Sequence, residues 1–199
     1  MHKLKKNYLF LFVIIIIGIV AGMLFSNVLS SDDQKLIYSR ITSFFLNLKD
    51  NTPIDYLNNL LELLRNDLLY LTIIIIMSFS VIGIIFNNFI LFLKSFILGF
   101  TIGSIINVYF YSGIVLSIFY VFPSKIINLI LFGILVYHAN YLSLKIFENI
   151  FKKKEHRFSL IIKNDLKIVG ILTLLFLLNN LFEVFLTPFI LKLFSFLIP

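Results

Sequence analysis

The sequence predicts an all-α membrane protein: a polytopic bundle of about five transmembrane helices, with a short re-entrant or interfacial helix and an outer helical hairpin. Composition is the first reason, because 60% of the 199 residues are hydrophobic, only 14% are charged and the mean hydropathy is +1.02. A soluble domain of this size has too little interior to hide so much apolar surface from water. The second reason is that the apolar residues gather in long runs, each near the roughly 20 residues that a helix needs to cross a bilayer.

These runs predict one integral membrane domain over residues 1–199. We treat the first run as a retained anchor and not a signal peptide, because it is long and Ser26–Ser30 has no clear small-x-small cleavage site. The ten-residue apolar stretch Gly113–Phe122 is too short to cross, which predicts a re-entrant segment over 113–123. The predicted spans are 8–29, 68–86, 95–112, 126–146 and 168–190.

The distribution of basic residues predicts the orientation. With the N-terminus inside, segments 1–7, 87–95 and 145–167 are cytoplasmic and hold most of the basic residues, as the positive-inside bias requires. The strongest marker is the Lys152–Lys154 run in the basic cytoplasmic loop 147–167. We therefore expect a multi-pass protein of the cell membrane with a cytoplasmic N-terminus and an outer C-terminus. The basic residues of the three segments are Lys3, Lys5, Lys6, Lys94, Lys145, Lys152, Lys153, Lys154, Arg157, Lys163 and Lys167.

Residues 31–66 form the outer hairpin and predict two short amphipathic helices. Ser31 followed by Gln34 resembles a capping box, in which two side chains satisfy free N–H groups at a helix start. Thr52-Pro53 predicts the next start, with threonine as the cap and proline at the first helical position. Such a hairpin can fold onto its own bundle, lie on the outer leaflet or dock a partner protein.

Glycines mark the positions where helices are expected to approach closely. Gly18-x-x-x-Gly22 and Gly99-x-x-x-Gly103 place small residues one turn apart, which makes a flat strip for another helix backbone. Gly83 is assigned to helix packing as well. Packing within the bundle is one interpretation of these motifs, and association with another protein is the other.

Glu183 is the unusual side chain, because an ionised carboxylate within hydrocarbon is costly. It lies five residues before Pro188, and Asn179 and Asn180 precede it by about one turn and are placed to share its hydrogen bonds. A transport or proton-relay role is one interpretation. We favour a structural or partner-contact role, because we find no second acid and no paired cation in any predicted span.

The sequence contains no candidate catalytic residue, metal site or cofactor site. His2, His138 and His156 lie far apart in the predicted topology, and catalytic and phosphate-binding motifs are absent. Cysteine is absent too, which excludes disulfides and thiolate chemistry. The net charge of +7 is scattered around apolar spans, which favours membrane lipids over nucleic acid as the partner.

Two stretches carry a resemblance to a known family. Within 93–127, a basic residue and an aromatic precede Gly99-Phe100-Thr101-x-Gly103, and a glycine-started apolar stretch then ends at Pro123. The tail 181–188 reads L-F-E-x-x-x-T-P. Together with Gly83 and the 18–22 segment, these motifs resemble the stage II sporulation protein M family over nearly the whole chain.

The resemblance implies a non-catalytic membrane scaffold that recruits or positions peptidoglycan-degrading enzymes at the septum during sporulation engulfment. Membrane-anchored peptidoglycan hydrolases are then the expected partners. The family often has Pro-Gln-Asn where this chain has Pro123-Ser124-Lys125, a departure that bears on partner identity if the turn contacts a partner. The alternative function is a small-solute transporter or channel component. Candidate partner-contact or structural residues are Phe122, Pro123, Glu183 and Pro188.

Overall fold

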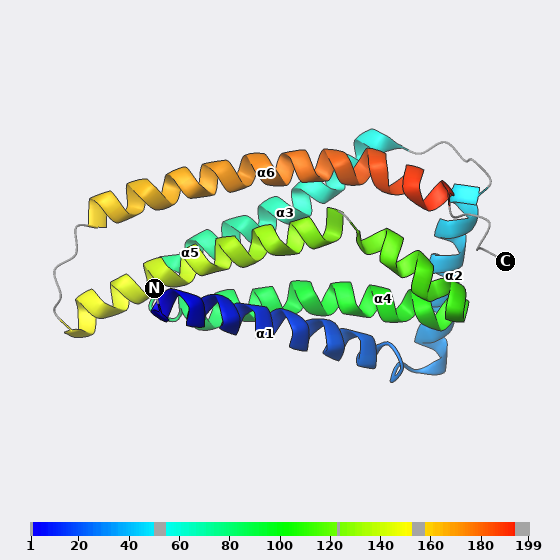
Figure 1. Cartoon of the computed structure of the whole chain (residues 1–199), viewed down its shortest axis with the longest axis horizontal. Helices are drawn as coiled ribbons and strands as arrows, with labels where there is room; N and C mark the ends of the chain where they lie inside the picture. Colours follow the sequence, from blue (N-terminus) through cyan, green and yellow to red (C-terminus); the bar gives the residue numbers. More distant parts are fainter. Residues whose placement is uncertain (1, 50–54, 123, 153–157, 194–199) are drawn as a thin grey trace.

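A computed structural model describes residues 2–49, 55–122, 124–152 and 158–193, and in these ranges it contains six α-helices and no strand. All helices except α2 run roughly along the long axis of the molecule, and α2 lies across one end (Figure 1). We call this the α2 end. The all-α fold class is thereby confirmed. The helices are α1 (His2–Phe25), α2 (Ser31–Lys49), α3 (Tyr56–Ser78), α4 (Gly83–Val121), α5 (Ser124–Lys152) and α6 (Phe158–Leu193).

The start of α2 is capped by Ser30, one residue earlier than the sequence predicted. Ser30 Oγ accepts the Asp33 backbone N–H at 3.3 Å and donates to the Asp33 carboxylate at 2.6 Å. The predicted pair of Ser31 and Gln34 is wrong, because the Ser30 carbonyl accepts the first helical bond, from the Gln34 backbone N–H at 2.9 Å. The cap is the residue that makes that bond, whatever polar side chains follow it.

Helix α2 packs onto the end of the bundle. Its side chains Phe45 and Leu48 are buried in a small core with Ile105 and Leu116 of α4 and Leu191 of α6. This is the arrangement expected of a hairpin segment that folds onto its own bundle.

Helix α3 is continuous where two segments were expected, an outer helix to residue 66 and a span over 68–86. It begins after the cap Asp55, whose side chain accepts the Asn58 backbone N–H at 3.1 Å, while Thr52-Pro53 lies outside the described residues. The stretch 62–70 contains no glycine or proline. The helix therefore continues through it, although its residues change from polar to apolar. The helix ends at Ser78, and the chain turns over 79–82. Helix α4 begins directly afterwards, at Gly83, so the expected loop 87–95 is helical.

Helix α4 reverses direction at Phe110, which has a left-handed backbone conformation with φ 50°. Residues 111–121 run back along the bundle from the α2 end (Figure 1). A Cβ at Gly113 would lie 2.6 Å from the Ile105 carbonyl oxygen, so glycine is what lets the two arms of α4 pack this closely. The segment 113–122 of the predicted re-entrant stretch lies in this second arm.

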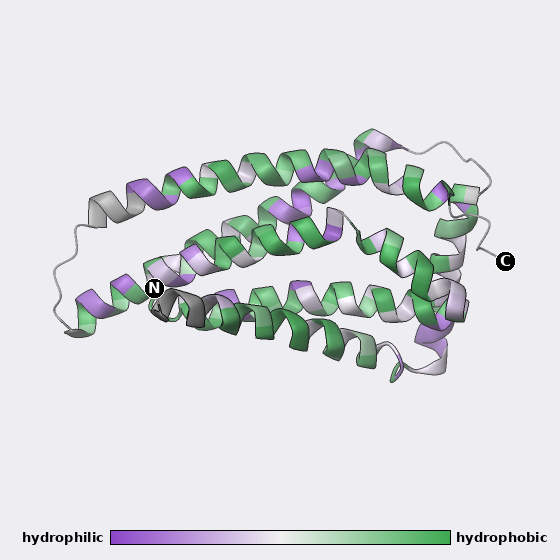
Figure 2. Ribbon diagram, viewed as in Figure 1, coloured by the Kyte–Doolittle hydropathy of each residue, from purple (hydrophilic) through white to green (hydrophobic). Residues whose placement is uncertain are grey.

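Four helices are long and apolar enough to cross a membrane, over Tyr8–Phe25, Gly83–Val121, Ser124–Phe151 and Lys163–Leu193. Many large apolar side chains on these helices are exposed, as lipid-facing side chains are, and apolar colour dominates these helices (Figure 2). Helix α3 differs, because Glu62, Arg65 and Asp67 interrupt its apolar sequence. The expected span 68–86 is therefore divided between the end of α3, the turn and the start of α4.

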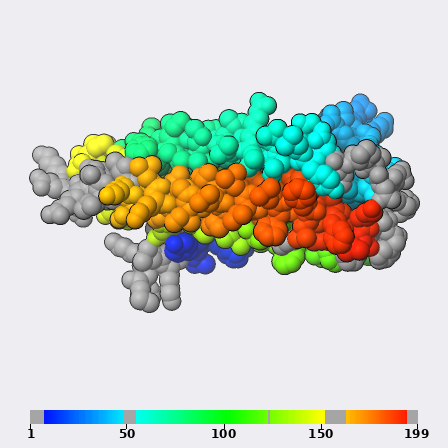
Figure 3. Space-filling model, turned by 90° about the horizontal axis from the view of Figure 1, so that it is seen from above, coloured from blue at the N-terminus to red at the C-terminus, as the bar shows by residue number. Residues whose placement is uncertain are grey.

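Helices α5 and α6 close the bundle. Helix α5 extends to Lys152 and α6 begins at Phe158, so much of the predicted loop 147–167 is helical. Residues 153–157 lie outside the described ranges. Helix α6 runs along one face beside α3 (Figure 3). The main core lies between these helices and includes Phe132, Leu135 and Val136 of α5 and Phe176 of α6.

Candidate functional site

The two small-residue motifs face each other in the contact between α1 and α4. The motif glycines are Gly18, Gly22, Gly99 and Gly103. A Cβ at Gly22 would lie 2.1 Å from the Phe96 carbonyl oxygen of α4, and one at Gly99 would lie 2.0 Å from the Ile19 carbonyl oxygen of α1. Real Cβ atoms do not approach other atoms closer than about 3 Å. These motifs therefore hold two helices of the same chain at close range.

The other residues singled out from the sequence lie in different places. Gly83 is the first residue of α4, directly after the turn, and a Cβ there would meet the Met77 carbonyl oxygen at 1.9 Å. Phe122 ends α4 and is 61% exposed, while Pro123 lies outside the described residues. Pro188 lies within α6, where it removes one backbone donor.

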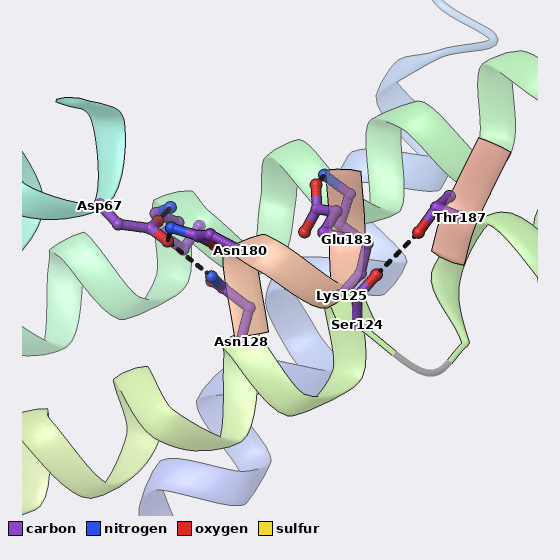
Figure 4. A network of polar contacts seen from close by, with 8 residues as sticks. Asp67, Ser124, Lys125, Asn128, Asn180, Glu183 and Thr187 are labelled. Carbon is purple, nitrogen blue, oxygen red and sulfur yellow. Dashed lines mark hydrogen bonds and ion pairs between the residues drawn. The ribbon is translucent and has the colours of Figure 1, made fainter. Parts of the chain in front are cut away.

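Asp67 is the centre of a buried polar group that the sequence did not predict. Its side chain is 8% exposed. One carboxylate oxygen accepts from Lys94 Nζ of α4 at 2.9 Å. The other accepts from Asn128 Nδ2 of α5 at 2.8 Å and Asn180 Nδ2 of α6 at 3.0 Å (Figure 4). Three donors from three helices thus compensate one buried charge, which is what makes its burial tolerable.

Glu183 forms a second buried ion pair, with Lys125 of α5. The Glu183 side chain is 8% exposed and that of Lys125 is 24% exposed. One helical turn further along, Ser124 Oγ and Thr187 Oγ1 lie 3.2 Å apart (Figure 4). The two motif pieces that carry the family resemblance, the turn after Pro123 and the tail around Glu183, therefore contact each other within the chain.

We call Asp67, Lys94, Lys125, Asn128, Asn180 and Glu183 the polar cluster. On α5, Lys125 and Asn128 are three residues apart, and on α6 Asn180 and Glu183 are three residues apart, so each pair shares one helix face. The two antiparallel helices therefore meet along successive polar contacts, which set their register. All members of the cluster except Asn180 line a cavity of about 310 Å³.

Lys94 has aromatic neighbours as well as its carboxylate. Its Nζ lies 4.5 Å from the centre of the Tyr70 ring and 4.4 Å from that of the Phe132 ring. Both distances are within the range of cation–π attraction. These rings, from α3 and α5, add to the contact that Lys94 of α4 makes with Asp67.

The polar cluster changes the interpretation of Glu183 as a lone acid without a paired cation. A second acid, Asp67, and a paired cation, Lys125, are both present in the bundle, and Asn180 donates to Asp67 instead of sharing the hydrogen bonds of Glu183. Asp67 lies 11 residues before Ser78, and Lys94 lies 11 residues after Gly83. At 1.5 Å per residue, both are about 16 Å from the turn between the helices. A turn predicted at 79–82 would have placed Asp67 and Lys94 at the same distance from it, and so beside each other.

A smaller polar contact lies nearer the opposite end of α5. His138 Nδ1 is 3.8 Å from Asp165 of α6, and Asn140 Nδ2 donates to Asn88 Oδ1 at 2.8 Å. Within the described residues, no three histidine or acidic side chains gather as a metal site would need. These polar side chains thus connect helices.

Comparison with known proteins gives one match. The family model described as stage II sporulation protein M matches residues 11–188, which is most of the chain and includes the polar cluster. No curated protein and no solved structure matches significantly.

Proposed function

Because the chain belongs to the stage II sporulation protein M family, whose members are sporulation-related membrane proteins, we propose that it is a non-catalytic scaffold. In this proposal it recruits or positions membrane-anchored peptidoglycan hydrolases at the septum during engulfment. The protein is a multi-pass membrane protein, as the four long apolar helices indicate. The α2 end then faces outward, where the wall enzymes are.

The observation that supports the scaffold is the exposed apolar surface of the α2 end. Val28 is 79% exposed, Leu36 of α2 is 56% exposed, and Phe110 and Tyr111 at the break of α4 are 74% and 89% exposed. Clustered apolar side chains of this size mark surfaces that contact a protein or lipid. They lie on α2, on the turn after α1 and at the break in α4. The surface is therefore formed by a turn and a helix break as well as by a helix (Figure 1).

A scaffold also needs a rigid support for that surface. The close α1–α4 contact at the glycines and the polar cluster between α3, α4, α5 and α6 both restrict helix sliding. Glu183 serves this structural role in the proposal, because its carboxylate is buried against Lys125. Phe122, which is largely exposed, stays a candidate for partner contact.

The proposal is tested by crosslinking and pull-down from membranes of septating cells. Wild-type protein is expected to recover peptidoglycan hydrolases, and Leu36→Glu with Tyr111→Glu is expected to lose them while the protein still inserts. Ile150→Glu is the matched control, since Ile150 is 59% exposed near the opposite end of α5. Recovery of no wall hydrolase with the wild-type protein would contradict the scaffold role.

A second candidate, a small-solute transporter or channel component, is favoured by one observation. The polar cluster supplies paired acids and cations, which were not expected from the sequence, and charged residues inside a membrane bundle commonly mark solute paths. This function predicts a substrate-dependent flux in liposomes that Glu183→Gln removes. A scaffold predicts no flux with either protein.

A further inference from the structure

We propose that the cavity lined by the polar cluster binds a small zwitterionic group, one that carries a primary ammonium and a singly charged anionic group. A free amino acid and the headgroup of an ethanolamine lipid share this chemistry. The inference rests on the cavity and its charges, and it goes beyond the scaffold role.

The cavity is too large to be a packing defect, and charged side chains form part of its wall. Its volume of about 310 Å³ has room for on the order of ten water molecules. Its wall includes both ion pairs, Lys94 with Asp67 and Lys125 with Glu183, together with the polar side chains of Asn66 and Thr101. A space with such walls inside a membrane bundle has to contain polar matter, whether water or a ligand.

The described contacts leave hydrogen-bonding capacity on both lysines and on Glu183. Each lysine has three N–H donors, and the described hydrogen bonds use one from Lys94 and one from Lys125. Asp67 already accepts three hydrogen bonds through its two oxygens, out of about four that a carboxylate can accept. Among the described contacts, Glu183 accepts through Oε1, which leaves Oε2 available. The lysines would therefore hold the anionic group, and Glu183 would hold the ammonium.

The charge balance selects a ligand without net charge. The wall carries two ammonium groups and two carboxylates, which cancel. A lone anion or cation would add one uncompensated charge to a low-dielectric site, which is costly. A zwitterion keeps the balance and satisfies both kinds of free hydrogen-bonding group.

The backbone around the cavity is also of a kind found at solute sites in membranes. Tyr120, near the end of α4, and Lys125, near the start of α5, both line the cavity, so two helix ends meet there. Interrupted helices within a bundle recur where membrane proteins bind polar ligands, because the free backbone groups then face the ligand.

The test is titration calorimetry on the full chain, purified in a maltoside detergent and washed free of lipid, at pH 7. The zwitterionic probes are glycerophosphoethanolamine and alanine, and the single-charge probes are ethanolamine and inorganic phosphate. We expect one zwitterion to bind with one site per chain, at least tenfold more tightly than either single-charge probe. Alanine binding would identify a soluble amino acid as the source. Glycerophosphoethanolamine binding, with phosphatidylethanolamine retained over phosphatidylglycerol in native mass spectrometry, would identify a lipid headgroup.

Variants locate the site. Lys125→Met with Glu183→Leu removes one ion pair without leaving a lone charge and is expected to weaken zwitterion binding at least tenfold. Lys145→Gln with Glu148→Gln removes an ion pair of 3.2 Å elsewhere on α5 and is expected to leave binding unchanged. Circular dichroism checks that each variant is folded.

Three outcomes would overturn the proposal: no probe binds, single-charge probes bind as tightly as zwitterions, or the folded Lys125→Met/Glu183→Leu variant binds like the wild type. If that variant does not fold, the selectivity of the wild-type protein among the four probes decides. Loss of wall-enzyme recovery in the pull-down would not affect this result, so the two proposals fail separately.

Discussion

Replacing Gly99 by alanine is the sharpest test of how α1 and α4 are held together. The new Cβ would lie 2.0 Å from the Ile19 carbonyl oxygen, against a lower limit of 3.0 Å for real Cβ contacts. The helices must therefore separate by about 1 Å. The obstacle is backbone on a facing helix, so no side-chain rotation relieves it. Overpacking of this kind costs about 1–3 kcal/mol.

The matched control is Gly170→Ala, because a Cβ at that helical position meets nothing within 4 Å. Alanine is the better helix former by about 0.5–1 kcal/mol, so this change is expected to keep or raise stability. The assay is reversible unfolding of the purified protein in mixed micelles, followed by circular dichroism. Gly99→Ala should lower the free energy of unfolding, by up to about 2.5 kcal/mol after the propensity gain is subtracted.

Equal stabilities of Gly99→Ala and Gly170→Ala would refute this reasoning. The α1–α4 contact would then not be the close backbone approach that the glycines permit.

Three further predictions concern the polar contacts and the orientation. Lys94→Met should cost about 3–5 kcal/mol of unfolding free energy, because it leaves Asp67 buried without its cation, and Asp67→Leu/Lys94→Met should recover most of that loss. A double variant as unstable as the single one would contradict it. Thr187→Val should cost about 0.5–1.5 kcal/mol in the same assay, and no loss would mean that its hydroxyl contact with α5 is not stabilising. Since the chain has no cysteine, Leu36→Cys should react with an impermeant thiol reagent in intact cells, and Ile150→Cys only after permeabilisation. The reverse pattern would invert the proposed orientation.

Local and compositional features were predictable. The apolar runs identified a helical membrane protein, and the two small-residue motifs identified positions of close helix approach. Each of these depends on residues within about one helix length, where hydrophobicity and backbone freedom act directly.

Helix boundaries at changes of polarity were less predictable. The sequence placed an end near residue 67 and a loop over 87–95, because charged residues there were assigned to aqueous segments. In the structure both regions are helix, since their charges pair across the bundle and need no water. A charged residue indicates a membrane boundary only when it has no partner in the interior of the bundle.

What the sequence determined by itself was the class of protein, the places where backbones meet and the absence of a recognisable catalytic motif. What only the tertiary structure decided was which charged residues meet. The partners of Asp67 are 27, 61 and 113 residues away in the chain, and Glu183 is 58 residues from Lys125. Pairing over such separations depends on the register of packed helices. That register is set by all the contacts along each helix together, so no short motif records it.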